Sequence, residues 1–478
     1  MFPIKARTTP MSVWRASKIL HCNTKPTSIK PRFGLLSKIL SHRAVMGTAQ
    51  LCSVSVANEE SLSLSSSSTC NTAVTCTTFN ILAPIYKRLN GQTRESEIRE
   101  CWIGRNEGIL EKLLPLKSSL YVCRRNVQEF WIGNGEFVGM YERRLGDAGY
   151  ATYKLARTNN RGDGLLTAIK QDQFKVLNYK ELVFNDFGDR VSQLLHLDLV
   201  NISQSQSLNT KKEALLVNTH LLFPHNAAYC LRRLLKVYRI LRYIKSYCEE
   251  HQVPQVPIIL CGDWNGSKNG NVYKFLRSQG FESSYDIVHR YTDGDADVHK
   301  WISHRNHRGN ICGVDFIWLL NPANARKSLT GSFVESLFGN IKSFIKKESN
   351  GTARIPDIVY DFKKDNHITY SQFCQSYTGL TSDLRDAITS EEMKDFWNCI
   401  DTNGDGIVDL SELESNQREY DTPSSPRKSK ISTTIAFNVK KAALYPPEVE
   451  KGVWPDYYSL SDHAQLTVEF VPMMNNCS

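Results

Sequence analysis

The stretch VPIILCGDWN, residues 256–265, carries the main signal for the fold. An apolar run from Val256 to Leu260 leads into a short polar turn, and this pattern indicates a buried strand that ends in the turn. Three polar or aromatic residues follow Gly262 directly, and they are Asp263, Trp264 and Asn265.

Comparable apolar runs recur on both sides of this stretch, and each ends in polar residues. They predict strands at 74–80, 165–169, 214–217, 314–318 and 463–471. Apolar residues at helical spacing predict helices over 95–114 and 228–248. Strands mixed with helices over about 250 residues predict an α/β fold, a two-layered β-sandwich flanked by helices.

The composition of the chain limits the class of protein to which it can belong. The chain has 478 residues, of which 41% are hydrophobic and 23% charged, and this is typical of a globular protein rather than a disordered or collagen-like one. At this length we expect about three domains, or one large enzyme with an insertion. Long uncharged apolar runs are missing, which argues against a transmembrane helix. The 13 cysteines lack CxxC spacing, so we expect mostly buried reduced thiols.

The net charge of +10 is concentrated at the N-terminus, because residues 1–58 hold nine Lys/Arg and no acid. The remainder of the chain is therefore close to neutral. This composition favours a mitochondrial or plastid presequence over 1–58, followed by a Ser-rich linker over 59–73. The alternatives are a basic tail, or a start at Met11 or Met46 that omits the segment. Without the presequence we expect a cytoplasmic or nuclear protein.

A polar, helical-period region over 325–435 interrupts the strand pattern, which resumes near Val453. We interpret it as an inserted all-α domain with a linker, so that the sandwich comprises 74–324 and 436–478. Residues 401–412 inside it fit an EF-hand loop. The expected Ca²⁺ ligands are Asp401, Asn403, Asp405, Ile407 through its carbonyl, Asp409 and Glu412, with Gly406 at the sharp turn.

A second half-hand is expected 40 residues upstream, over 361–372, where Ile368 matches Val408. Lys363 and Gln372 stand at positions 3 and 12 of that loop, so it should bind calcium weakly or not at all. We therefore predict an EF-hand pair with one competent site. The alternative is that 361–372 is an unrelated loop.

Six polar signatures stand at predicted strand ends: TFN (78–80), QEFW (128–131), NTHL (218–221), GDWN (262–265), VDFIW (314–318) and SDH (461–463). Their order resembles the endonuclease/exonuclease/phosphatase superfamily, which has the deoxyribonuclease-I-like fold, over about 74–320 and 453–472. TFNILAP (78–84), GDGLL (162–166) and NTHL are similar to carbon-catabolite-repressor-type deadenylases. The added EF-hand makes the chain resemble the plant calcium-binding members.

The resemblance implies a role for each of eight residues. Glu129, Asn80 and Asp462 would hold Mg²⁺ or Mn²⁺, which neutralises charge at a phosphodiester. Asp263 would activate or position the attacking water, and Asn265 would orient the phosphate. His220 and His463 would donate hydrogen bonds to phosphoryl oxygens, with Asp315 fixing the His463 tautomer. One-metal and two-metal mechanisms both stay open.

The segment before Glu129 departs from the family pattern, because Arg124, Arg125, Asn126 and Val127 separate the apolar strand from Gln128. Two arginines in a central strand are costly unless they are paired. Either the chain bulges here or the register of Glu129 is shifted, through a splice-boundary error or a loss of activity. Phosphate binding by Arg124 and Arg125 is a less favoured reading.

The sequence therefore predicts a metal-dependent phosphodiester hydrolase, a 3′–5′ exoribonuclease with a calcium-binding EF-hand and a nucleic-acid substrate. Trp131 and Trp264 are candidates for base stacking near the site. The alternatives are a phosphatase acting on a small phosphorylated metabolite or lipid headgroup, and a catalytically weak calcium sensor.

Overall fold

The structure is a computed structural model of the whole chain. It describes residues 73–124, 130–200, 212–223, 227–268, 270–292, 300–337, 367–379, 388–409, 412, 420–421 and 434–475. The predicted presequence and most of the Ser-rich linker lie outside these residues. The chain divides into two compact units, Met1–Ser67 and Ser68–Ser478, and every described residue lies in the second. Among the described helices, none is long and apolar enough to cross a membrane.

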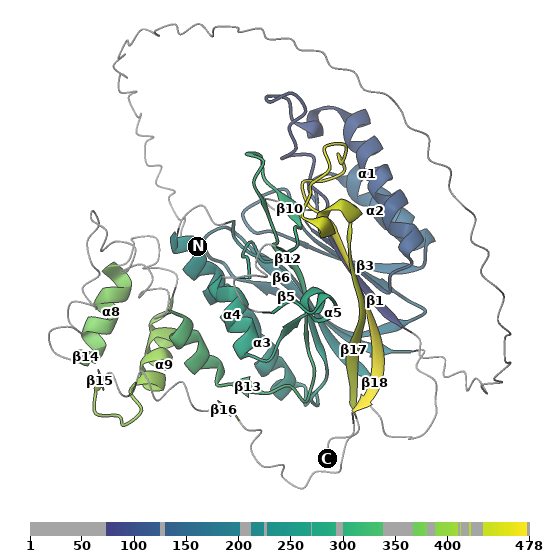
Figure 1. Cartoon of the computed structure of the whole chain (residues 1–478). Coiled ribbons are helices and arrows are strands. Elements are labelled where there is room, and N and C mark those ends of the chain that lie inside the picture. Colours follow the sequence, from purple (N-terminus) through teal and green to yellow (C-terminus); the bar gives the residue numbers. More distant parts are fainter. Residues whose placement is uncertain are drawn as a thin grey trace, which may run out of the picture. The chain divides into compact units, whose positions relative to one another are not determined.

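Two six-stranded sheets form the centre of the second unit (Figure 1). The first has the order β17-β18-β1-β2-β4-β3 and the second the order β5-β6-β7-β8-β12-β9. The first sheet comprises β1 (Val74–Asn80), β2 (Leu120–Arg124), β3 (Tyr150–Ala156), β4 (Gly164–Lys170), β17 (Thr434–Tyr445) and β18 (Gln465–Asn475). The second comprises β5 (Phe174–Val183), β6 (Val191–Leu199), β7 (Glu213–His220), β8 (Ile258–Asp263), β9 (Glu282–Ser283) and β12 (Asp315–Leu320).

The inner faces of the two sheets share one hydrophobic core. Val122 and Val468 from the first sheet belong to the same buried cluster as Leu216, Ile259 and Ile317 from the second. β7 and β8 are buried along nearly their whole length, as expected of strands covered on both faces. The arrangement confirms the predicted two-layered α/β sandwich.

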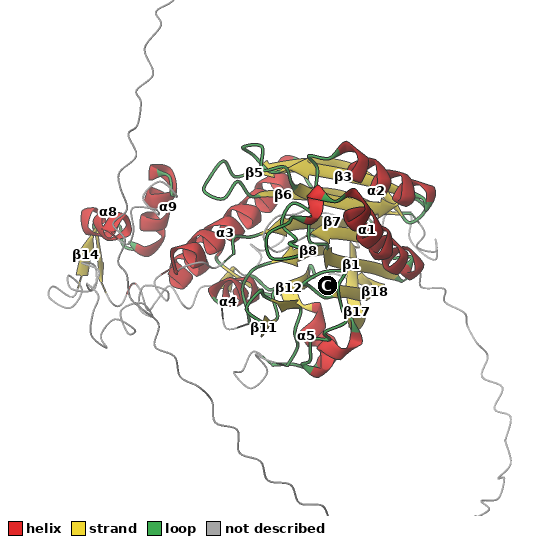
Figure 2. Ribbon diagram, turned by 90° about the horizontal axis from the view of Figure 1, so that it is seen from above, coloured by secondary structure: helices red, strands yellow, loops and turns green. Residues whose placement is uncertain are grey.

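Helices cover both outer faces of the sandwich (Figure 2). α1 (Arg99–Leu113) and α2 (Gly135–Asp147) pack on the first sheet through a second cluster that includes Trp102, Tyr121 and Phe137. α3 (Ala227–Glu250) and α4 (Asn271–Ser278) lie on the opposite side, and α5 (Ser284–His289) contacts β12 and β17.

The predicted polar region emerges from a short ladder. β13 (Arg326–Lys327) pairs with β16 (Tyr420–Asp421), so the chain leaves and returns at adjacent positions. Between them lie β14 (His367–Thr369), α8 (Tyr370–Gly379), α9 (Ser390–Ile400) and β15 (Ile407–Asp409). A third small ladder, β10 (His304–Arg305) with β11 (Ile311–Cys312), precedes β12.

Two expectations need correction. The strand pattern resumes at β17 rather than near Val453, because Lys440 and Lys441 on this edge strand obscure its alternation. The cysteines are free where they are described, but only Cys76 and Cys261 are buried, whereas Cys101 is exposed and the others are intermediate.

Candidate active site and calcium site

Three predicted site residues lie side by side on neighbouring strands of the second sheet. β7 runs parallel to β8 with His220 opposite Asp263, and β12 runs antiparallel to β8 with Asp315 opposite Asp263. Parallel neighbours end at the same edge of a sheet, and the antiparallel β12 starts there. The register therefore brings an imidazole and two carboxylates together, and all three side chains are buried.

A tight turn after β8 sets the orientation of Asp263 and Asn265. The backbone of Asn265 has φ = 49°, a left-handed conformation that asparagine tolerates better than most residues. Its amide nitrogen donates to Asp263 Oδ1 at 2.8 Å, and its side-chain amide donates to the carbonyl of Leu221 at 2.9 Å. The GDWN signature thus fixes one carboxylate and one amide at the edge of the sheet.

His220 has a partner that the sequence did not indicate. An Arg190 guanidinium nitrogen lies 2.9 Å from His220 Nδ1, and both residues are buried. Arginine can only donate, so Nδ1 is the acceptor in this hydrogen bond. Nε2 faces the other site residues, at 3.7 Å from Asp263 Oδ2 and 3.1 Å from the side-chain nitrogen of Asn265.

His463 is paired with Asp315, as the resemblance implied. Nδ1 of His463 lies 2.7 Å from Asp315 Oδ2, which also accepts a hydrogen bond from Ser303 Oγ at 2.7 Å. The pair orients the imidazole so that Nε2 lies 4.0 Å from Asp263 Oδ2. The ring is fully buried.

Asn80 and Asp462 lie beside this group. Asn80 Nδ2 donates to Asp263 Oδ2 at 3.4 Å, and the Asn80 carbonyl accepts from Ser461 Oγ at 2.5 Å. The Asp462 side chain is about one-third exposed, and its Oδ2 lies 3.9 Å from His304 Nε2. The oxygens of Asn80 and Asp462, next to the buried carboxylate of Asp263, fit a divalent cation by donor chemistry.

Glu129 lies outside the described residues, as do Arg125 to Gln128, so its predicted metal contact stays a prediction. The strand pairing on either side of this segment still shows how many residues separate the paired positions. Cys123 pairs with Leu166, whereas Phe130 bridges Gly164, so seven steps on one strand oppose two on the other. The chain before Phe130 is therefore five residues longer than an uninterrupted ladder needs, which agrees with the expected bulge or register shift.

Of the two tryptophans considered for base stacking, Trp264 is packed inside the protein and Trp131 is half-buried. Trp264 is 1% exposed and stands edge-on to Trp318, with 6.4 Å between ring centroids. Trp131 is half-buried against Trp102 at 5.6 Å. The exposed aromatic residue near Asp462 in sequence is Tyr457, which is 71% exposed.

Three aspartates outside the six polar signatures, Asp172, Asp186 and Asp189, differ in their surroundings. Asp172 is exposed. Asp189, however, is buried and accepts from Arg161 and Asn159, and Asp186 forms an ion pair with the fully buried Lys236. Burial lowers the pKa of Lys236 to about 8, although Asp186 opposes the shift.

The calcium loop has the internal bonds of an EF-hand. Gly406 (φ = 84°) donates its amide hydrogen to Asp401 Oδ2 at 3.1 Å, whereas the buried Asp401 Oδ1 has no hydrogen-bond partner. The Glu412 carboxylate is buried and accepts from the backbone of Thr402, Asn403 and Asp409 at 2.9–3.2 Å. The Asp401 oxygen that accepts no hydrogen bond and the buried carboxylate of Glu412 are both suited to bind a cation.

The second half-hand pairs with the first. β14 is antiparallel to β15, with Ile368 opposite Val408, and both side chains are fully buried. The Gln372 side-chain oxygen accepts from the backbone and the hydroxyl of Thr369, at 2.7 and 2.8 Å. Residues 361–366 lie outside the described chain, so weak binding by this loop stays a prediction.

The entering helix of the calcium loop, α9, contacts the sandwich helix α3. Arg239 on α3 donates two hydrogen bonds to the Glu392 carboxylate, at 2.9 and 2.7 Å, and also lies 3.5 Å from Asp186. Beside this pair the ring of Phe396 packs against Tyr238, with 5.4 Å between centroids. The charged and aromatic contacts together join the EF-hand to the helix behind β7 and β8.

Comparisons with known proteins agree with this arrangement. Residues 359–417 match the family model of an EF-hand domain pair. An "uncharacterized calcium-binding protein" of Arabidopsis thaliana is 48% identical over 420 residues, which cover 85% of this chain and 86% of that protein. The chain therefore belongs to the family of this calcium-binding protein, within the endonuclease/exonuclease/phosphatase superfamily. The matched EF-hand pair includes the calcium loop described above.

More distant relatives cover less of the chain. Carbon catabolite repressor protein 4 homolog 3 of Arabidopsis thaliana is 28% identical over 37% of this chain and 36% of its own length. The 3′-5′-exoribonuclease subunit Ccr4 of the CCR4-Not complex of Debaryomyces hansenii is 22% identical over 49% and 32%. This chain thus spans about a third of each of these relatives. The human Nocturnin catalytic domain covers 53% of this chain and 84% of its own, with 19% identity and a TM-score of 0.39.

Proposed function

We propose that the protein is a Mg²⁺-dependent (or Mn²⁺-dependent) phosphodiester hydrolase that removes nucleotides from RNA 3′ ends, with calcium bound at its EF-hand. The observation that carries the proposal is the convergence of His220, Asp263, Asn265, Asp315 and His463 at one end of the sandwich. The family relationship supports phosphoester chemistry. The RNA substrate is favoured by the 3′-5′-exoribonuclease among the relatives.

Each of the described site residues contributes a particular atom to the proposed reaction. Asp263 Oδ1 is held by the Asn265 backbone, and Oδ2 faces His220 and His463, so the carboxylate can accept a proton from, and orient, an attacking water. His220, when it carries a proton on Nε2, can donate to a non-bridging phosphoryl oxygen. His463, held by Asp315, presents Nε2 from the opposite side. The side-chain amide of Asn265 lies between Asp263 and His220 and can orient the phosphate.

A divalent cation held by Asn80, Asp462 and Glu129 would neutralise charge that develops on the phosphate. Localisation in a mitochondrion or plastid is part of the proposal only if the presequence is used.

Hydrolysis of poly(A), single-stranded DNA and a panel of small phosphate esters by the full chain with Mg²⁺ tests the proposal. We expect poly(A) to be shortened from its 3′ end, and Asp263→Asn to lower the rate by about 10²-fold or more. Asp456→Asn is the matched control, because that side chain is almost fully exposed. Hydrolysis of only the small esters would favour the phosphatase alternative. Full activity in both Asp263→Asn and Glu129→Gln would reject the site.

A further inference from the structure

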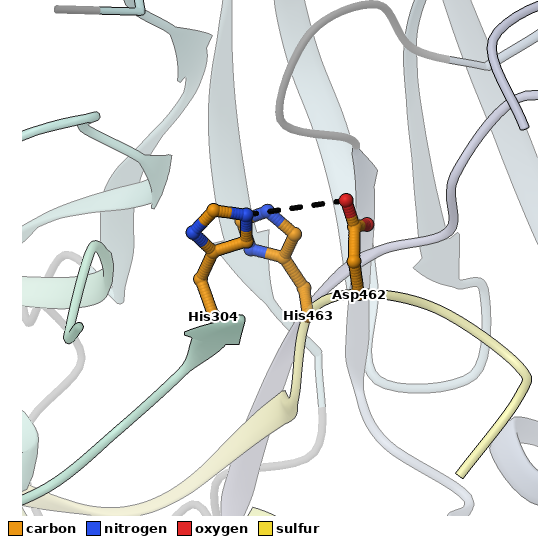
Figure 3. A group of neighbouring side chains, drawn as sticks. All are labelled: His304, Asp462 and His463. Atoms are coloured by element: carbon orange, nitrogen blue, oxygen red, sulfur yellow. Dashed lines mark ion pairs between the residues drawn. The ribbon is translucent and has the colours of Figure 1, made fainter. Parts of the chain in front are cut away.

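A compact group of two histidines and one aspartate lies at the start of β18, and the proposed reaction uses only part of it. His304, Asp462 and His463 each offer one ligand atom, and these atoms all lie within 4.8 Å of one another (Figure 3). His304 Nε2 lies 3.9 Å from Asp462 Oδ2, and the two imidazole rings stack with centroids 4.3 Å apart. Both rings are buried, whereas Asp462 is partly open to solvent.

Backbone pairing holds this group in place. An antiparallel bridge joins His304 to His463. On either side of it, Arg305 N donates to the Asp462 carbonyl at 2.9 Å and Ala464 N donates to the Ser303 carbonyl at 2.7 Å. The group is therefore built by main-chain contacts between β10 and the segment before β18, and does not depend on loose surface side chains.

The neighbours of the two rings leave one nitrogen of each facing the group. Asp315 takes Nδ1 of His463, which leaves Nε2 as the ligand atom. Ligating histidines in metal sites commonly give their second ring N–H to a carboxylate in this way. Nδ1 of His304 lies 3.6 Å from Cys312 Sγ, so Nε2 is the nitrogen of this ring that faces Asp462.

Two imidazole nitrogens and one carboxylate oxygen favour Zn²⁺ and related transition metals over Mg²⁺ and Ca²⁺, which prefer oxygen ligands. We propose that His304, Asp462 and His463 bind Zn²⁺, and that this ion inhibits hydrolysis. Tetrahedral zinc needs its ligand atoms roughly 3.3 Å apart and must itself lie in the plane of each imidazole. To close the group, Asp462 must rotate inward and the His304 ring must turn out of its stack on His463. A bound ion occupies the His463 Nε2 lone pair and competes with Mg²⁺ for Asp462.

The binding site stands on geometry alone, whereas the inhibition rests on the proposed function. Co²⁺ is a suitable probe, because its visible absorption reports tetrahedral nitrogen and oxygen ligands independently of activity. The full chain is first saturated with Ca²⁺ at the EF-hand and then titrated with Co²⁺. We expect one equivalent to give a visible band that Zn²⁺ abolishes.

Three variants locate the site. His304→Asn removes a ligand and should weaken Co²⁺ binding by at least about tenfold. His304→Phe keeps a ring against His463 without a nitrogen, so the same loss there separates ligation from packing. His251→Asn is the matched control, because this exposed histidine is not part of the group, and it should bind Co²⁺ as the wild type does.

No band in the wild-type protein, or equal binding by His304→Asn, overturns the site. The inhibition is measured as the ratio of hydrolysis rates with and without Zn²⁺ for each protein, and His304→Asn should need a higher Zn²⁺ concentration for half-inhibition. Cobalt binding without zinc inhibition overturns the inhibitory role. If no protein hydrolyses any substrate, the proposed function fails, and the inhibition with it, while the absorption titration still decides the site.

Discussion

At the scale of single residues, the arrangement of the site depends on pairs in which one side chain fixes another. Asp315 orients His463 at 2.7 Å, and Arg190 orients His220 at 2.9 Å. The first pair is a carboxylate behind a histidine, and the second is a cation. Because Arg190 can only donate, it holds the His220 ring through Nδ1 as the acceptor.

Replacing Arg190 tests this positioning role. Arg190→Met removes the donor that orients the His220 ring, and we expect kcat to fall by about tenfold, which equals about 1.4 kcal/mol of activation free energy. Arg190→Lys keeps a donor and should recover part of the loss. The kinetic readout is kcat against KM on poly(A). Wild-type kcat in Arg190→Met would contradict the assignment, as would a loss confined to the melting temperature.

At the scale of secondary-structure elements, the unusual feature is β2. Its register with β4 holds as far as Cys123 and resumes five residues out of step at Phe130. Gly164, opposite Phe130, has no room for a side chain, because a Cβ there would lie 2.2 Å from the Leu155 carbonyl oxygen. The five extra residues belong by count to the segment between Cys123 and Phe130, because β4 is continuous from Gly164 to Leu166.

Deleting residues 124–127 leaves one extra residue, which a single bulge accommodates. We expect the variant to melt at a higher temperature, to hydrolyse poly(A) faster, or both. Circular dichroism melting and the poly(A) assay measure the two effects. If the deletion abolishes both folding and activity, the arginines belong to the working fold.

Calcium binding by the loop at residues 401–412 is expected to depend on one carboxylate. Glu412 accepts three backbone hydrogen bonds and is the expected bidentate ligand. We expect Glu412→Gln to weaken calcium binding by about tenfold or more, or about 1.4 kcal/mol, in calorimetric titration. Gln372→Glu in the other half-hand is the informative comparison, because it restores a carboxylate at position 12. An unchanged calcium affinity in Glu412→Gln would exclude residues 401–412 as the binding loop.

The sequence predicted β1, β4, β7, β8, β12 and β18 because their signals are local, whereas the equally buried β6 was not predicted. β1 was predicted at its observed bounds, and the EF-hand loop follows from side-chain spacing alone. Arg190 and His304 could not be found this way, since each acts through a contact made only by tertiary packing, and the two-residue β10 has no periodicity. β17 was missed because edge strands carry lysines. The stacking role of Trp264 was wrong because a tryptophan next to catalytic residues can equally point into the core.

At the scale of the whole molecule, the EF-hand and the catalytic sandwich are joined through α9 and α3. A series of charged contacts runs from Glu392 to Arg239, Asp186 and Lys236, and Arg190 of the active site lies close enough to influence the charge of Lys236. Filling the calcium loop acts on α9 directly, because Asp401 follows its last residue. We therefore expect calcium to alter hydrolysis through α3.

Arg239→Gln should reduce the ratio of poly(A) hydrolysis rates with and without Ca²⁺ towards one. Arg242→Gln is the matched control on the same helix, because its pairing with Asp395 is solvent-exposed at 3.7 Å and should contribute little. An identical calcium response in the wild type and Arg239→Gln would rule out this route.

The contact between Arg239 and Glu392 should also depend on pH. Burial alone would raise the pKa of Glu392, but hydrogen bonds from Arg239 and Thr389 outweigh it and lower the pKa below the usual range. Because the pKa of Glu392 is lower in the folded state, the ionised carboxylate stabilises the fold at pH values above the unfolded-state pKa of about 4.3. This contribution is lost as the pH falls through the folded-state pKa. The stability difference between wild type and Glu392→Gln in urea unfolding should be constant from pH 5 to 7 and shrink below about pH 4. A difference that grows on acidification would contradict this.

The ladder between β13 and β16 makes the calcium module separable in principle. Arg326 faces Asp421 and Lys327 faces Tyr420, so the backbone gap left by cutting out everything between them is no wider than a hairpin. An Asn-Gly turn could close it. A gene could therefore gain or shed this segment in one event, although its loss would take Phe396 from Tyr238 and Glu392 from Arg239 on α3. A form of the protein that does not respond to calcium would be a single excision away.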